Sequence, residues 1–254
     1  MTKTPALFVG HGAPMNAIED NAFSRKWREL GQTLPRPQSI LCISGHWVEH
    51  CVAITASDRP ETVHDFYGFP PEYYRLRYAS PGDRALARRA AELLAVPVRF
   101  DAARGLDHGT WSVLMQMYPE ADIPVVQLGL DADRPLAEHH EIATRLAPLR
   151  DEGVMVMGSG NIVHNLSMFQ LGRDAPADWA QRFDERVREW IASGDVEALA
   201  DPGRLGRDAQ LAVPTAEHYV PLLYAMAVRR DDDALSFFNE AVTSTVSMTS
   251  FLLQ

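Results

Sequence analysis

Short apolar runs that contain or end at glycine constrain the fold of this chain more than any other feature. Four of them, residues 5–9, 39–44, 123–130 and 153–161, are rich in β-branched and other apolar side chains. Glycine follows the first two directly and lies inside the other two. Continuous apolar runs of this length predict strands that are buried on both faces, as in a parallel sheet.

Helical patterns alternate with these runs, so we expect an α/β fold. The pattern predicts one domain over residues 1–254, with a mostly parallel central sheet and helices on both faces. Residues 51–57 are predicted to pair with 39–44 as a hairpin through GHWVEH, residues 58–81 to form a long ordered loop over a pocket, and the tail 235–253 to add two strands. Another strand is expected at 96–100, and helices at 21–34, 82–95, 110–118, 135–150, 178–194 and 218–228.

Composition narrows the class of protein. The 254 residues are 46% hydrophobic and 23% charged, which allows a sizeable core without disulfides. A net charge of −10 argues against a nucleic-acid partner. The first residues lack the apolar stretch and cleavage site of a secretion signal, and no apolar run is long enough to span a membrane, so we expect a cytoplasmic protein. In that reducing compartment Cys42 and Cys51 are expected to be free thiols.

Five histidines lie just after apolar runs or in glycine-bounded turns: His11, His46, His108, His164 and His218. Strands of a parallel sheet end at a common edge where ligands bind, and neutral imidazole is a common ligand of first-row metals. A metal centre is therefore predicted, although no compact motif such as HExxH fixes its ligands. Two histidines and one carboxylate are an alternative set, with Glu217 as the carboxylate.

The other histidines and one glycine-rich motif give weaker indications of a functional site. His139 and His140 are expected to be solvated on a charged helix, and His50 to lie in a turn or at a strand edge. His64 is equally compatible with lining a pocket and with ordinary packing. The GSGN sequence at 158–161 lacks the spacing of a dinucleotide-binding loop and of a serine-hydrolase elbow. We therefore expect neither function.

Six ordered motifs together resemble one known family. They are GHGAP (10–14), SGHW (44–47), HDFYGFP (64–70), DHGTW (107–111), GSGNIVHNL (158–166) and EHYVPLLYA (217–225). In this order they resemble the extradiol ring-cleaving dioxygenases of the LigB superfamily, in particular the DOPA 4,5-dioxygenase branch. The resemblance implies a LigB-like α/β domain that inserts O2 into the ring of a catechol and yields a muconic semialdehyde.

The same resemblance implies the site. Fe(II) is the metal expected for turnover, with Zn(II) able to occupy its place, and His11, His46 and His218 match the metal ligands. In the protocatechuate-type branch the third ligand is a glutamate, so Glu217 stays an alternative to His218. His164 matches an acid–base catalyst that is also a fourth ligand when substrate is absent, and His108 matches a second catalytic histidine beside substrate and O2.

Substrate contacts are expected from His64, Asp65, Phe66 and Trp111, within or beside an aromatic loop that also holds Tyr67, Phe69 and Tyr73. The expected partners are a small aromatic diol and O2, with no nucleic acid and no membrane, and the chain is expected as a monomer or a small homo-oligomer. Two other functions remain open: a Zn-dependent hydrolase on a related α/β fold, and a metal-binding module without turnover.

Overall fold

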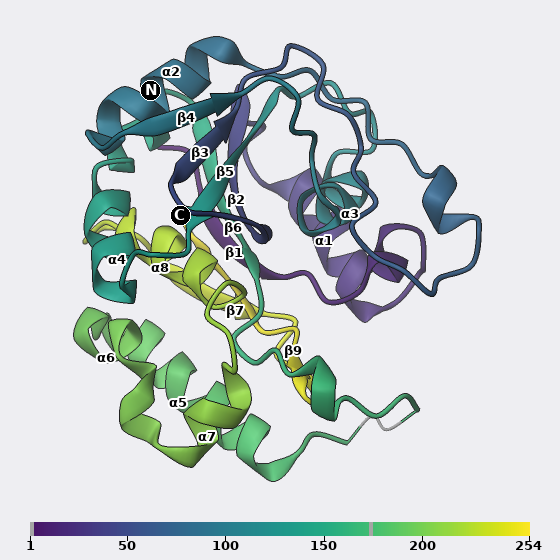
Figure 1. The fold of residues 1–254 in the computed structure, drawn as a ribbon, viewed down its shortest axis with the longest axis vertical. Helices are drawn as coiled ribbons and strands as arrows, with labels where there is room; N and C mark the ends of the chain where they lie inside the picture. Colours follow the sequence, from purple (N-terminus) through teal and green to yellow (C-terminus); the bar gives the residue numbers. More distant parts are fainter. Residues whose placement is uncertain (1–2, 173–174) are drawn as a thin grey trace.

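An eight-stranded mixed sheet forms the centre of the molecule (Figure 1). The structure is a computed structural model that describes residues 3–172 and 175–254. The strand order of the sheet is β4-β3-β5-β2-β6-β1-β10-β7. The strands are β1 (Ala6–Gly10), β2 (Ser39–Glu49), β3 (Val52–Thr55), β4 (Val98–Asp101), β5 (Val125–Asp131), β6 (Val154–Gly160), β7 (Leu235–Phe238) and β10 (Ser250–Leu253). A separate ribbon pairs β8 (Val242–Thr243) with β9 (Val246–Ser247).

The four strands at the centre of the sheet, β5, β2, β6 and β1, run parallel to one another. β3 is antiparallel to β5 but parallel to β4, and β10 is antiparallel to both β1 and β7. The expected mostly parallel sheet is thus confirmed, with antiparallel additions toward its edges.

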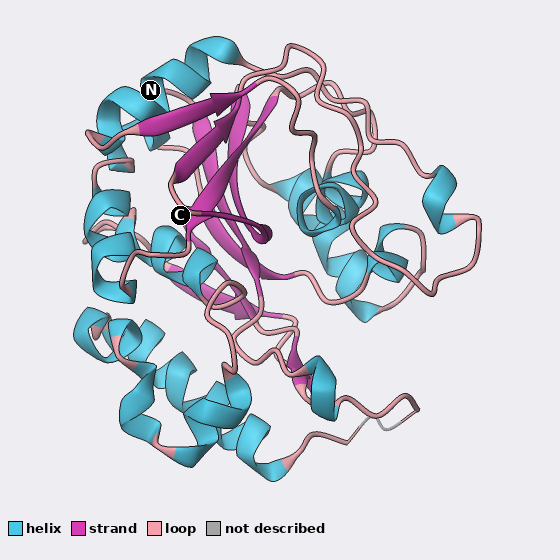
Figure 2. Cartoon of the chain, viewed as in Figure 1, coloured by secondary structure: helices cyan, strands magenta, loops and turns pink. Residues whose placement is uncertain are grey.

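Helices cover both faces of the sheet, as predicted (Figures 1 and 2). One face packs against α1 and α3, where Trp27 and Leu114 join Leu7 and Val9 in one apolar cluster. The other face packs against α2, α4 and α8, and α5 to α7 extend this second layer. The helices are α1 (Ala22–Thr33), α2 (Arg84–Leu94), α3 (His108–Met117), α4 (Leu136–Thr144), α5 (Asp178–Ser193), α6 (Val196–Ala200), α7 (Arg207–Ala212) and α8 (Val220–Ala227).

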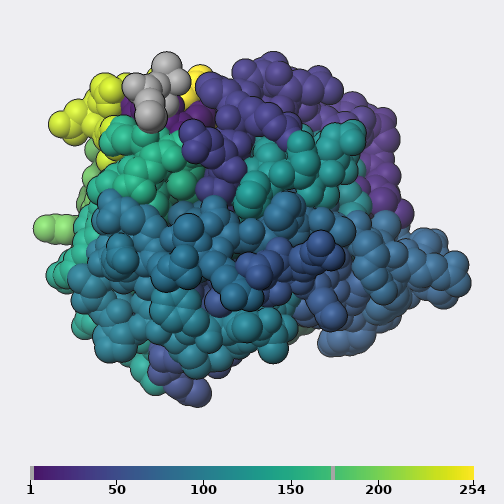
Figure 3. Space-filling model, turned by 90° about the horizontal axis from the view of Figure 1, so that it is seen from above, coloured from purple at the N-terminus to yellow at the C-terminus, as the bar shows by residue number. Residues whose placement is uncertain are grey.

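The connection from β3 to α2 is long, as expected, and contains the short 3₁₀ helix η2 (Tyr73–Arg75). Viewed from above, the part of this loop around η2 projects from the body of the molecule (Figure 3). Thr62 in the same loop bridges to Leu106, just before α3. The loop is therefore attached to α3 on one side of its projecting part.

The predicted hairpin of 39–44 with 51–57 is wrong. β2 continues through Gly45 and His46 to Glu49, with a change of register between Ile43 and Val48, and β5 lies between β2 and β3. Because β2 keeps pairing with β5 as far as Glu49, the chain turns only at residues 50–51, and β3 then pairs with the other edge of β5. The tail adds two strands to the sheet, β7 and β10, as expected, and it also forms the β8–β9 ribbon between them.

Histidine placement on α4 was also predicted wrongly. His139 is buried, with its ring nitrogens near the Tyr224 hydroxyl at 3.2 Å and the Asp131 carbonyl at 3.1 Å, because α4 packs on α8. His140 is half-buried, whereas His50 is exposed beside Asp133.

Both cysteines are free thiols, and Cys42 is buried. In residues 3–172 and 175–254, no helix has the length and apolar character needed to cross a membrane.

Candidate metal centre

The fold brings the five predicted histidines to one edge of the sheet. His11 and His164 follow β1 and β6, His46 lies in the irregular part of β2, His108 is the first residue of α3, and His218 lies just before α8. Asp107 caps the amino end of α3 by accepting from the Thr110 backbone N–H and from the Ser44 hydroxyl, which fixes where His108 begins the helix. Neighbouring rings in the group lie with centroids 3.6–5.6 Å apart.

Three of the rings direct the same atom toward one point. The Nε2 atom of His46 lies 3.0 Å from that of His11 and 3.2 Å from that of His218. Two imidazole nitrogens bound 2.0–2.1 Å from one tetrahedral ion would be separated by about 3.3 Å. The spacing of the three Nε2 atoms therefore suits a single divalent metal.

Each of these three rings has a hydrogen-bond acceptor at its other nitrogen. His11 Nδ1 lies 3.0 Å from Ser159 Oγ, which donates its own proton to the Gly109 carbonyl and so accepts from the ring. His46 Nδ1 lies 3.1 Å from a carboxylate oxygen of Asp65, and His218 Nδ1 lies 3.3 Å from one of Glu217. In their neutral form the three rings are consequently Nδ1–H tautomers with their Nε2 lone pairs directed at one another, an arrangement that fits a cation between them.

Burial keeps most of the cluster neutral. Burial, followed by the charge of neighbouring histidines, holds the pKa of His11 well below its ordinary value and lowers the pKa of His164 to about 3. Burial outweighs the Glu217 contact and lowers the pKa of His218 to about 4. His46 differs: burial lowers its pKa, but Asp65, Asp107 and Glu217 together raise it above the ordinary value. Neutral imidazole is the form that ligates metals.

His108 and His164 lie beside the three converging rings. His108 has its ring centroid 4.0 Å from that of His46, and its Nδ1 lies 2.9 Å from Asp65. Burial, partly opposed by Asp65, lowers the pKa of His108. His164 stacks on His218 at 3.6 Å, and no group in the described part of the chain hydrogen-bonds its ring. Both rings therefore border the three-histidine group.

The residues expected to contact substrate form an aromatic group next to His108. The Phe66 ring lies edge-on to His108 with centroids 5.5 Å apart and is close to His64 and Trp111. Trp111 is fully buried and donates its indole N–H to the Val63 carbonyl. Tyr67 lies outside this group and is 91% exposed. Phe66 and His64, both half-buried, are the members best placed to meet a ligand.

Sequence reasoning missed the groups that orient the rings. Ser159 was considered only as a nucleophile, although a hydroxyl inside a buried apolar strand is itself a signal of a specific hydrogen bond. Asp65, expected as a substrate contact, lies against His46 and His108 in the structure. Glu217, the alternative metal ligand, contacts the Nδ1 atom of His218 and not the atom that faces the centre.

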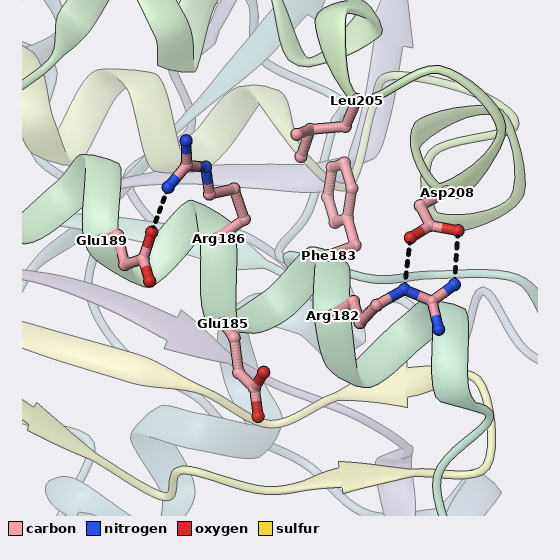
Figure 4. A pocket seen from close by; sticks show the side chains of 7 residues that line it. All are labelled: Arg182, Phe183, Glu185, Arg186, Glu189, Leu205 and Asp208. Atoms are coloured by element: carbon pink, nitrogen blue, oxygen red, sulfur yellow. Dashed lines mark hydrogen bonds and ion pairs between the residues drawn. The ribbon is translucent and has the colours of Figure 1, made fainter.

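One surface pocket lies apart from the histidines. It has a volume of about 310 Å³, and Figure 4 shows the seven residues that line it: Arg182, Phe183, Glu185, Arg186, Glu189, Leu205 and Asp208. Arg182 pairs with Asp208 and Arg186 with Glu189, so the arginines of its lining are already paired with carboxylates. We assign it no ligand.

Comparison with known proteins shows the family to which the chain belongs. Residues 4–250 match the family model described as the catalytic LigB subunit of aromatic ring-opening dioxygenase. The chain is 49% identical over 230 residues to a 4,5-DOPA dioxygenase extradiol of Escherichia coli K12, covering 89% of this chain and 85% of that protein. A protein of the same name from Beta vulgaris is 39% identical over 228 residues, covering 87% and 85%. A crystal structure of an uncharacterized Escherichia coli K12 protein superposes with a TM-score of 0.87 at 40% identity, covering 99% of this chain and 100% of that one.

Proposed function

The chain belongs to the LigB family of extradiol ring-opening dioxygenases, and from this premise we propose that it opens the ring of a DOPA-like or other single-ring catechol with O2, giving a muconic semialdehyde. We propose the whole chain, 1–254, as one catalytic domain. The observation that carries the proposal is the convergence of three Nε2 atoms whose rings all have a hydrogen-bond acceptor near Nδ1.

His11, His46 and His218 are the proposed ligands of Fe(II), and Zn(II) is expected to occupy the same place. When bound, the iron supplies positive charge that favours a deprotonated diol, together with the redox chemistry that O2 requires. Three neutral ligands leave the full charge of the ion available to an anionic substrate. His164, stacked on His218, is the proposed fourth ligand in the absence of substrate.

Proton transfer is the proposed task of His108 and His164. The Nδ1–H of His108 points at Asp65, so its Nε2 carries the lone pair that accepts a proton from a catechol hydroxyl. The lowered pKa of His164 keeps it neutral before it takes part. Each transfer contributes about 10²- to 10⁴-fold in rate, and the two histidines can exchange the roles of base and acid.

The aromatic group supplies the proposed binding surface for the ring of the substrate. Phe66 stands edge-on to His108, and His64 lies beside it with its Nε2 3.1 Å from the Leu76 carbonyl. A flat aromatic ring placed against Phe66 would exclude water from the histidines. Trp111, buried behind them, is proposed to support His64 and Phe66.

Oxygen uptake tests the proposal. Protein loaded with Fe(II) under anaerobic conditions is mixed with DOPA, caffeate and simpler catechols, and O2 consumption and product spectra are recorded. We expect stoichiometric O2 uptake and a yellow semialdehyde product with at least one diol. Hydrolysis of esters or amides by the Zn(II) protein without O2 uptake would favour a hydrolase, and bound metal without any turnover would favour a binding module.

A further inference from the structure

We infer that Asp65 is a positioning residue that holds a proposed metal ligand, His46, and a proposed base, His108, in one fixed tautomer and mutual orientation. The inference rests on the proposed function for the roles of the two histidines. It replaces the expectation that Asp65 contacts substrate.

Both oxygens of the Asp65 carboxylate are occupied by these two residues. Oδ1 lies 2.9 Å from His108 Nδ1 and 3.0 Å from the His108 backbone nitrogen, and Oδ2 lies 3.1 Å from His46 Nδ1. The Asp65 side chain is 19% exposed. One carboxylate thus receives three donors from two site residues, which leaves it little capacity to bind a substrate hydroxyl.

The loop that carries Asp65 is attached on both sides of it. The Val63 backbone N–H donates to the Leu106 carbonyl at 2.8 Å, and the Trp111 indole donates to the Val63 carbonyl at 2.8 Å. After the projecting part of the loop, the Tyr78 hydroxyl donates to the Tyr118 carbonyl at 3.0 Å. These attachments to α3 and its flanks place Asp65 independently of any metal or substrate.

An ionised carboxylate only accepts hydrogen bonds, so both imidazoles must present Nδ1–H to it. The lone pair of each ring is then on Nε2. For His46 this atom faces the other two proposed ligands. For His108 it is the nitrogen that can accept a proton. The negative charge also stabilises the imidazolium that forms when His108 takes that proton, as a buried aspartate does for a catalytic histidine elsewhere.

Asp65→Asn changes this chemistry with almost no change of shape. An amide has one oxygen and one NH₂ group, so it cannot accept from both rings. The ring that faces the NH₂ group must change to the opposite tautomer. That change removes the lone pair from the metal side of His46 or from the proton-accepting side of His108.

The test compares wild type, Asp65→Asn and a control, Glu72→Gln, which removes one charge from an exposed position of the same loop. Zn(II) affinity is measured by competition with a chelator, and kcat and KM are measured with Fe(II). Ring tautomers are measured by ¹⁵N NMR of the histidines in the metal-free protein, at a pH high enough to leave His46 neutral. For Asp65→Asn we expect Zn(II) binding about 10- to 100-fold weaker, or unchanged binding with at least a 10-fold loss of kcat, and a changed tautomer of the corresponding ring. Glu72→Gln should match wild type.

Wild-type tautomers and wild-type Zn(II) affinity in Asp65→Asn would overturn the inference. If that variant does not fold, the wild-type spectrum decides, because Nε2–H on either His46 or His108 contradicts it. Absence of O2 uptake with every diol, together with the expected tautomer and affinity changes, would refute the proposed function and leave the positioning role intact.

Discussion

The Nδ1 atoms of the proposed metal ligands have three different partners: the hydroxyl of Ser159 and the carboxylates of Asp65 and Glu217. These partners are drawn from β6, from the aromatic loop and from the residue next to His218. Orienting groups of this kind raise the basicity of a ligand and fix which nitrogen meets the metal. The candidate centre is therefore defined by six residues and not by three histidines alone.

Replacing His218 by alanine should abolish metal retention and leave the fold intact, because the apolar core does not depend on the site. Metal content after dialysis and the thermal unfolding of the metal-free protein measure the two effects. His50→Ala, at an exposed histidine, is the matched control. Full metal occupancy with normal turnover in His218→Ala would remove this residue from the ligand set.

His108→Ala and His164→Ala should have the opposite effect, since the proposed role of these residues is proton transfer. We expect metal to be retained and kcat to fall by about 10²- to 10⁴-fold. Steady-state kinetics at matched iron content separates the two effects. A variant that loses its metal together with its activity would instead identify that histidine as a required ligand.

At the scale of the elements, close backbone approaches place the histidines. A Cβ atom on Gly160, at the end of β6, would lie 2.1 Å from the His218 carbonyl oxygen, and one on Gly45 would lie 2.9 Å from the Glu217 carbonyl oxygen. Only glycine lets β6 and β2 lie this close to the segment before α8. The glycines that end the apolar runs therefore have a direct role in assembling the centre.

Gly160→Ala should displace His218 from the other two rings. Inserting a methyl group into this packed region costs about 1–3 kcal/mol of stability, and a shift of about 1 Å at the site can reduce turnover about 10²-fold. Zn(II) affinity and urea unfolding are the measurements. Gly203→Ala, whose new methyl group would meet its nearest neighbour at an ordinary 3.4 Å, is the control, and equal behaviour of the two variants would contradict this account.

The helices and strands could largely be predicted from the sequence, but the pairing of the strands could not. The spacing that predicted α1, α2 and α5 is confirmed because each helix buries an apolar face. The β2–β3 hairpin failed because a short connection looked like a turn between partners, whereas β5, more than 70 residues later in the chain, inserts between them. Sequence proximity cannot reveal which strand edge is taken by a distant strand.

At the scale of the whole molecule, a buried ion pair joins segments that are far apart in the sequence. The side chains of Arg150 and Asp233 are both fully buried, with their charged groups 2.6 Å apart. Arg150 also donates to the carbonyls of Thr4, Val228 and Leu253. The pair links the start of β1, the end of α8 and the last strand. No motif in the sequence indicated it, because each partner is an ordinary charge until the fold places the two together.

This pair predicts a pH dependence of stability. Burial raises the pKa of Asp233, but hydrogen bonds from Arg150, Lys3 and the Arg230 backbone lower it to about 2, below the value of 3.8 in an unpaired state. Since the folded-state pKa is the lower one, the contribution of about 2–3 kcal/mol is complete above pH 4 and is lost as the pH falls toward 2.

Asp233→Asn should cost about 3–5 kcal/mol near neutral pH, because it leaves Arg150 buried without its counter-charge. Urea unfolding of wild type and variant between pH 7 and pH 3 measures the difference, which should shrink at the acid end. Asp232→Asn removes a neighbouring carboxylate that is 76% exposed and serves as the control. A pH-independent difference would show that the pair does not act through its charge.

The sequence predicted the histidines of the candidate centre, but not their orientation. Each of them follows a recognisable apolar run, motif or turn, so their gathering at one edge was expected from topology. The tautomers depend on Ser159, Asp65 and Glu217, whose contacts arise only when the strands, the aromatic loop and the segment before α8 come together. Apart from the Ser159 hydroxyl inside a buried apolar strand, local patterns carry no signal for such contacts.

Anomalous diffraction at the iron edge, from crystals loaded with Fe(II) without oxygen, tests the central claim most directly. The account predicts one iron peak about 2.1 Å from the Nε2 atoms of His11, His46 and His218, with at least two coordination positions not taken by protein once a catechol analogue is bound. An iron held instead by His46, Asp65 and His108, or enclosed on all sides by protein ligands, would contradict it.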